Sequence, residues 1–153
     1  MPASRALVTE REKLSVATEQ LDTALRLYFG RHDYFSVITL AGAAEEILGV
    51  YLKIHGQPNA FDETLESSLR VYRWLFGEEE SRDSLHKTVN RVKNSSKHMM
   101  GKNDISLECN PREEAKKVLD RAVSNYYCLM EFEEINETPR IRKFNEHLLG
   151  RHA

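Results

Sequence analysis

Apolar residues recur along the chain at the spacing of α-helices. The clearest pattern lies between Asp33 and Gly56, where apolar positions follow one another at i, i+3, i+4 and i+7, as on one face of a helix. These positions are Val37, Leu40, Ala41, Ala44, Ile47, Leu48 and Tyr51. Because Ile38, Val50 and Ile54 add apolar side chains on other sides, this helix is predicted to be the central one, with Asp33 as its N-cap.

The same spacing predicts further helices on both sides of the central one. Their approximate ranges are 8–29, 62–76, 81–100, 111 to the residues before Pro139, and 140–149. The strongest start signal is Asn110 as N-cap with Pro111 at the first helical position and Glu113 at the third. Gly30 is the expected stop of the first helix.

No strand-like alternation of useful length appears in the chain. The sequence therefore predicts an all-α fold, a compact up-and-down bundle of five to six helices. Its length fits a single domain, 1–153, with a helical core at about 8–136 and a short C-terminal helix or tail at 137–153.

Composition agrees with a folded domain and narrows the chemistry. The apolar fraction is 41% and the charged fraction is 30%, as in globular proteins. Cys109 and Cys128 have no redox or metal spacing and are expected to be reduced. Charges interrupt the first twenty residues, and the longest uncharged apolar stretch is residues 37–44. A cytoplasmic protein without a membrane span is therefore predicted.

Familiar catalytic motifs are missing from the sequence, including the P-loop, the dinucleotide-binding glycines and the zinc-protease His-Glu-x-x-His. A di-iron bundle needs two Glu-x-x-His pairs, and the nearest approach is Asp83-x-x-His86. We therefore expect no metal and no cofactor.

Charge is distributed unevenly along the chain. The net charge is −2, yet residues 82–102 hold six basic residues and one acidic residue, a local charge of +5. The basic residues are Arg82, Lys87, Arg91, Lys93, Lys97 and Lys102. Such a segment is either a phosphate-binding surface or a solvated helix face.

The part of this segment from Val89 to Met99 also concentrates amides and hydroxyls. At 100° per residue, Arg91 and His98 lie within about 20° of each other on a helix, and Asn94 joins them. Arginine can hold a phosphate and stabilise transition-state charge, and histidine can transfer the proton at neutral pH. These groups suit phosphodiester cleavage, although a solvated face with an incidental histidine remains the alternative.

The order of these elements resembles the HEPN (higher eukaryotes and prokaryotes nucleotide-binding) family. The resemblance covers about residues 13–130 and rests on a long first helix, on residues 41–53 (Ala-Gly-Ala-Ala-Glu-Glu-Ile-Leu-Gly-Val-Tyr-Leu-Lys) and on residues 93–98 (Lys-Asn-Ser-Ser-Lys-His). It implies a four- to five-helix bundle, commonly dimeric. It also implies metal-independent endoribonuclease chemistry around Arg-x(4 to 6)-His.

Two alignments with that motif are open. Arg91 to His98 has the six-residue spacing, but apolar Val92 follows the arginine. Lys93–Asn94 to His98 has the polar second residue, but lysine replaces the planar guanidinium. The candidate catalytic residues are therefore Arg91, Lys93, Asn94 and His98.

Further candidates are substrate-binding residues. They are Glu45, Lys87, Asn90, Lys97 and Lys102. Glu45 flanks the apolar stripe of the second helix, where the resemblance implies a polar residue that faces the motif, and an ordinary carboxylate at the edge of the core is the alternative. The expected partners are RNA and a second copy paired through the fourth helices. The alternative function is a non-catalytic interaction or RNA-binding module with a protein partner, such as a regulator of the antitoxin type.

Overall fold

The computed structural model describes residues 10–148 and 150. The helices in chain order are α1 (Lys13–Phe29), α2 (Tyr34–Ile54), α3 (Ala60–Phe76), α4 (Arg82–Ser95), α5 (Pro111–Leu129) and α6 (Pro139–Leu148). No strand occurs among the described residues. The predicted all-α bundle is therefore confirmed, whereas the start predicted at residue 8 and the end at residue 149 lie outside the described residues.

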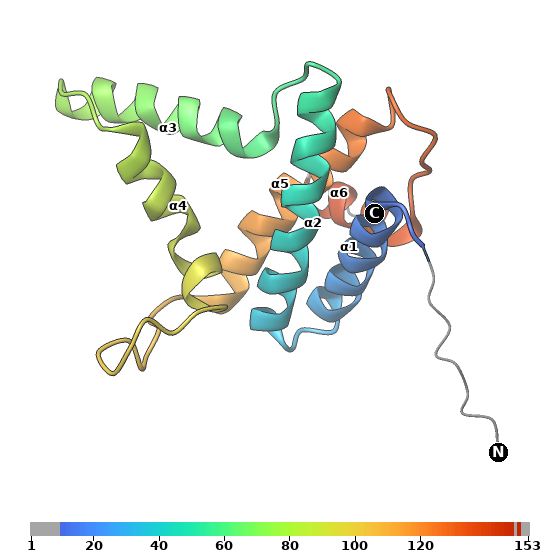
Figure 1. Ribbon diagram of the computed structural model, residues 1–153, viewed down its shortest axis with the longest axis horizontal. Coiled ribbons are helices and arrows are strands. Elements are labelled where there is room, and N and C mark those ends of the chain that lie inside the picture. Colours follow the sequence, from blue (N-terminus) through green and yellow to red (C-terminus); the bar gives the residue numbers. More distant parts are fainter. Residues whose placement is uncertain (1–9, 149, 151–153) are drawn as a thin grey trace.

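The core forms where α1, α2 and α5 pack side by side, with α6 against α1 (Figure 1). Each helix contributes its predicted apolar stripe. The largest fully buried side chains include Leu21 and Leu25 of α1, Ile38, Leu48 and Leu52 of α2, Leu119, Tyr126 and Leu129 of α5, and Ile141 and Phe144 of α6.

α2 is the central helix, as predicted, because it packs against both α1 and α5. By length and composition alone α2 is apolar enough to cross a membrane, with a mean hydropathy of 1.5 over its most apolar stretch. Half of that stretch is buried inside the structure.

α3 and α4 form an arm beside this core. In Figure 1, α3 extends away from the bundle and α4 returns toward it. Leu65 is the one fully buried residue of α3, whereas Phe76, which the periodicity places inward, is 62% exposed. Within the arm α3 packs against α4, and the arm joins the core where α3 packs on α5 and α4 packs on α2.

Side-chain caps start four of the helices, including α6, where the Thr138 hydroxyl accepts from the Ile141 N–H at 3.2 Å. Asn59 accepts a hydrogen bond from the Asp62 N–H, so α3 begins at Ala60, ahead of the predicted start behind Asp62. Ser81 accepts from the Ser84 N–H at the start of α4. Asn110 accepts from the Glu113 N–H, which confirms the predicted cap of α5.

The turn between α1 and α2 differs from the prediction. α1 stops before Gly30, but Arg31 adopts the left-handed conformation, with φ of 60°. Asp33 also has a positive φ and caps no backbone N–H, because its carboxylate binds the His32 ring at 2.6 Å. Asp33 therefore occupies the predicted N-cap position of α2, but its side chain makes no capping hydrogen bond.

α4 ends earlier than the sequence predicts. Its last residue is Ser95, not Met100, and a turn and an irregular loop follow. The backbone carbonyl of Asn94 still accepts N–H groups from Lys97 and His98, each at 3.1 Å. His98 therefore lies one turn beyond the helix and not within it.

Candidate functional site

Lys93 lies inside the structure, between α4 and α2. It is 5% exposed, and its Nζ is 3.0 Å from Glu46 Oε1 and 3.9 Å from Glu45 Oε2. Space for its aliphatic chain exists because position 42 is glycine: a Cβ there would stand 2.7 Å from Lys93 Cδ. The position of α4 against α2 thus depends on an ion pair at Lys93.

Glu45 is the acidic centre of this buried cluster. Its Oε1 accepts from Arg121 Nε of α5 at 2.6 Å, and its Oε2 accepts from Arg121 Nη2 at 3.4 Å. Both the Lys93 ammonium and the Arg121 guanidinium lie over the ring of Phe61 in α3, at 5.9 and 5.7 Å from its centroid. We call Glu45, Glu46, Lys93 and Arg121 the buried ion-pair cluster; it contains two positive and two negative charges.

Asn125 extends the cluster to the backbone. Its Nδ2 donates to the carbonyl of Glu45 at 3.3 Å, and its Oδ1 accepts from the Ala60 N–H at 2.8 Å. Four helices therefore meet at one polar centre, in which nearly every buried donor has a partner. Two buried acceptors have no hydrogen-bond partner among the described residues: Gln20 Oε1, and Oδ1 of Asn90, which is 6% exposed.

Arg121 and Asn125 are not among the residues that the sequence pattern indicated for the site. Both lie on the buried side of α5, at i and i+4, beside the apolar residues Ala122 and Tyr126. A signal existed in the sequence, because polar residues that interrupt an apolar stripe need a buried partner. Glu45, at the edge of the stripe of α2, is the complementary residue.

Three of the predicted site residues are therefore interior. Glu45, Asn90 and Lys93 are all less than 9% exposed, and the charges of Glu45 and Lys93 are already balanced by neighbouring side chains. In this arrangement they hold helices together and present no open surface to a substrate. Glu45 does face α4, but its shorter contact is with Arg121 of α5, and the exposed Glu46 makes the shorter contact with Lys93.

The other six predicted residues are exposed. They are Lys87, Arg91, Asn94, Lys97, His98 and Lys102. Arg91 Nη2 donates to the carbonyl of Glu108 at 3.2 Å, which links α4 to the loop before α5. No ion pair involves Lys87, Lys97 or Lys102 within the described part of the chain. We call these six residues, on α4 and the following loop, the α4 surface.

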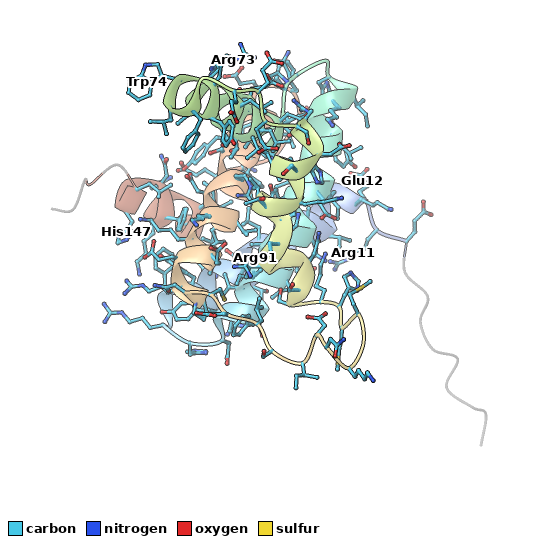
Figure 2. All side chains as sticks on the ribbon, turned by 90° about the vertical axis from the view of Figure 1, so that its left-hand side faces the viewer. Arg11, Glu12, Arg73, Trp74, Arg91 and His147 are labelled. Atoms are coloured by element: carbon cyan, nitrogen blue, oxygen red, sulfur yellow. The ribbon has the colours of Figure 1, made fainter. Side chains whose placement is uncertain are left out.

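Arg91 lies at one edge of a cleft between α3, α4 and α5, on the face of the molecule that Figure 2 presents. The cleft has a volume of about 470 Å³, and Thr64, Lys117 and Asp120 also line it. His98 and Asn94 are not among its lining residues. The structure therefore does not enclose Arg91 and His98 in a common cleft of one chain.

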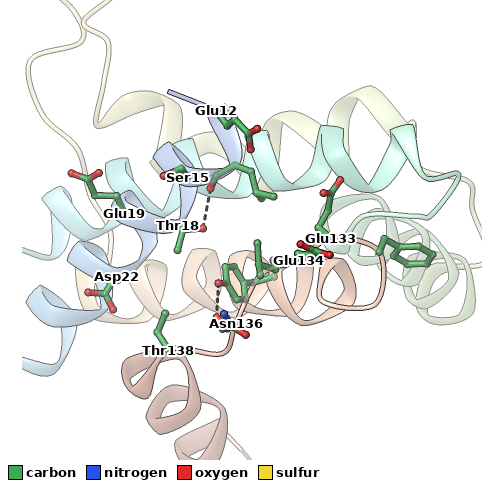
Figure 3. Close-up of a pocket in the computed structure, with 13 residues that line it drawn as sticks. Glu12, Ser15, Thr18, Glu19, Asp22, Glu133, Glu134, Asn136 and Thr138 are labelled. Atoms are coloured by element: carbon green, nitrogen blue, oxygen red, sulfur yellow. Dashed lines mark hydrogen bonds between the residues drawn. The ribbon is translucent and has the colours of Figure 1, made fainter. Parts of the chain in front are cut away.

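A larger cavity lies elsewhere, between α1 and the segment that joins α5 to α6 (Figure 3). Its volume is about 860 Å³. The carboxylates that line it belong to Glu12, Glu19, Asp22, Glu133 and Glu134. A groove with this charge repels phosphate, so it does not extend the α4 surface.

The fold and the site define an all-α helical protein with a buried ion-pair cluster beneath an exposed basic surface. Comparison of the chain with protein-family models, with curated proteins and with solved structures finds no match. The functional argument therefore rests on the residues themselves.

Proposed function

We propose that the chain is an RNA-binding helical domain of the HEPN type, and that the α4 surface binds phosphates of the RNA. The observation that carries the proposal is the contrast between Lys93, which is buried and paired, and Lys87, Lys97 and Lys102, which are exposed and unpaired among the described residues. Unpaired lysines keep their full charge for a polyanion, whereas paired ones do not.

The buried ion-pair cluster has a structural role in this proposal. It fixes α4, which carries Lys87 and Arg91, to α2 and α5, and Lys97 and Lys102 lie in the loop that follows this helix. Of the two alignments with the HEPN motif, the one through Lys93 has no accessible cation. The alignment through Arg91 has an accessible cation, because Arg91 is exposed and, within the described part of the chain, its side chain donates to the Glu108 carbonyl alone.

Binding is tested by fluorescence anisotropy with a labelled single-stranded RNA. Affinity should fall as salt rises, with a log–log slope of roughly −0.7 for each phosphate contact. The variant Lys87→Glu/Lys97→Glu should bind at least tenfold more weakly. Its matched control, Lys13→Glu/Lys53→Glu, changes the net charge equally on α1 and α2. Equal losses from both variants would mean that only net charge matters and would overturn the proposal.

Cleavage is the chemistry that the same surface would support. Arg91 would stabilise the charge on phosphorus, Asn94 would orient the phosphate, and His98 would act as general acid or base for attack by the ribose 2′-hydroxyl. Incubation of RNA with the protein in EDTA should then leave 2′,3′-cyclic phosphate ends. His98→Ala should lower the rate by about 10² to 10⁴, whereas His32→Ala should not. Uncut RNA would limit the function to binding.

A second candidate function is protein association through α3. Val71, Trp74 and Leu75 share one side of the helix and are 53%, 83% and 57% exposed. Figure 2 shows Trp74 at the outer end of α3, directed away from the bundle. Val71, Leu75 and Phe76 also border a shallow apolar groove of about 310 Å³, and exposed patches of this kind mark association surfaces.

The occupant that fits this groove is a second copy of the chain. Three consecutive glutamates, residues 78–80, form an acidic tip after α3, and the basic α4 surface follows this tip along the chain. A twofold antiparallel pairing of two arms would therefore bring the acidic tip of one copy close to the α4 surface of the other. Light scattering should find a dimer that Trp74→Ser converts to a monomer. Phe35→Ser, which replaces another exposed aromatic residue, should remain dimeric. A monomeric wild-type protein at micromolar concentration would exclude this candidate.

A further inference from the structure

A second concentration of positive charge lies away from the α4 surface, where the end of α1, the start of α5 and α6 meet. These elements enclose a pocket of about 200 Å³. Its lining residues are Tyr28, Phe29, Arg31, Arg112, Lys143 and His147. The lining contains three permanent positive charges, one imidazole and no carboxylate. We call this site the cationic pocket.

Aromatic packing makes the floor of the cationic pocket rigid. The ring of Tyr28 stands edge-on to Phe29 and to the fully buried Phe144, with centroids 5.8 and 5.7 Å apart. The ammonium group of Lys143 lies 4.2 Å from the centroid of the Phe29 ring. One of the cations is therefore held in place by the floor itself.

The positive charges in the pocket have no ionic partner. Arg31, Arg112 and Lys143 form no ion pair within the described residues. Burial raises the pKa of Tyr28, and Arg112, close to the hydroxyl, acts in the opposite direction. The carboxylate that acts on Tyr28 is that of Glu113, which does not line the pocket. Like charges gathered without a counterion repel, and a bound anion would relieve this repulsion.

The backbone at Arg31 adds to this arrangement. Arg31 has a φ of 60°, a left-handed conformation that is strained for a residue with a side chain and that glycine usually adopts at the end of a helix. Here glycine stands one position earlier, at Gly30, where a Cβ would lie 2.7 Å from the His32 ring. An arginine therefore occupies the strained position of this turn, and its side chain lines the cationic pocket.

We propose that the cationic pocket binds a phosphate group. Two guanidinium groups and an ammonium group suit the geometry of phosphate oxygens, and Arg112 lies in the first turn of α5, where the helix N-terminus favours anions. Ligand pockets for whole small molecules measure roughly 300 to 1,000 Å³. A volume of about 200 Å³ therefore accepts the phosphate of a phosphomonoester and leaves the rest of the ligand outside. This proposal stands independently of RNA binding by the α4 surface.

The test is a titration of the labelled protein with inorganic phosphate at constant ionic strength, followed by amide NMR shifts. Saturable shifts are expected at residues 28–31, at Arg112 and in α6. Arg112→Gln/Lys143→Gln should weaken binding at least tenfold, whereas Lys13→Gln/Lys53→Gln should not. Absence of saturable shifts in the pocket, or equal affinity of the double variant, would overturn the proposal. If the double variant loses its helical circular dichroism, the exposed Lys143→Gln alone is compared, with a loss of at least threefold expected.

Two further ligands identify the source of the phosphate. Uridine 5′-monophosphate should bind at least tenfold more tightly than uridine, and a 5′-phosphorylated RNA is compared with its 5′-hydroxyl form. A preference for both phosphorylated forms indicates that RNA ends also enter the pocket, whereas a preference for the mononucleotide alone indicates a free small molecule. Equal binding of uridine and its monophosphate would contradict the proposal. Lys87→Glu/Lys97→Glu should leave phosphate binding unchanged, which separates this site from the α4 surface.

Discussion

Replacing Glu45 by glutamine tests whether the buried ion-pair cluster holds the bundle together. The substitution preserves shape but removes the charge that accepts from Arg121 at 2.6 and 3.4 Å. The side chains of Glu45 and Arg121 are 3% and 10% exposed, so water cannot replace the lost partner. Lys93 keeps Glu46 at 3.0 Å, but Arg121 is left as an unpaired buried cation.

The expected cost follows from that uncompensated charge. Breaking one side of a buried ion pair destabilises a protein by about 3 to 5 kcal/mol. In a protein of this size, 1 kcal/mol shifts the melting temperature by about 2 to 4 °C, so Glu45→Gln should lower it by roughly 6 to 20 °C. The measurement is thermal and urea unfolding followed by circular dichroism.

Two further variants make this result interpretable. Glu19→Gln removes one partner of the exposed Arg11–Glu19 pair, and it should change stability by less than about 1 kcal/mol. Glu45→Met/Arg121→Met removes both buried charges and should recover much of the loss. If Glu45→Gln costs no more than Glu19→Gln, the reasoning about the cluster is refuted.

Three more predictions concern single side chains. Gly42→Ala should destabilise the wild-type protein because the added Cβ would lie 2.7 Å from Lys93 Cδ. In a Lys93→Ala background the same substitution should stabilise the protein by roughly 1 kcal/mol, because alanine favours the helix more than glycine does. Chemical unfolding of the wild-type protein, the two single variants and the double variant measures both effects. A hydrogen bond from Tyr127 and a second from a neighbouring arginine lower the pKa of Glu137. The ionised Glu137 therefore stabilises the fold above the usual glutamate pKa, and this stabilisation is lost as the pH falls through the lowered pKa. Tyr127→Phe should therefore make stability less sensitive to acid in unfolding curves between neutral pH and pH 3, and an unchanged slope would contradict this. Asn110→Ala should cost about 1 kcal/mol in the same unfolding assay by removing the cap of α5.

The helices with long apolar stripes were predictable from the sequence because their periodicity directly reflects burial. α2 occupies its predicted position, and α5 begins behind Asn110 as expected, but α5 ends at Leu129 and not, as predicted, just before Pro139. The end of α4 was not predictable in the same way. Its apolar set is thin, and no glycine or proline follows Ser95 before Gly101. The stop therefore depends on tertiary contacts, such as that of Arg91 with the Glu108 carbonyl.

The candidate site was predictable only in part, for a related reason. A helical wheel places Lys93 among exposed polar residues, and nothing in its neighbourhood along the chain indicates burial. Its burial depends on a space beside Gly42 and on the carboxylate of Glu46. Both of these belong to another helix, so local spacing does not encode them. The exposed positions of Lys97 and His98 needed no distant partner, and the sequence indicated them correctly.

Amide shift mapping during titration with single-stranded RNA tests the central claim most directly. The account predicts that shifts concentrate in the exposed positions of α4 and the following loop, residues 87–102, and weaken as salt rises. The amides along the acidic groove, at Glu12, Glu19 and Glu133, should stay unchanged. Shifts that concentrate in the acidic groove or on α3, or an RNA titration without saturable shifts in residues 87–102, would contradict the proposal that the α4 surface binds RNA.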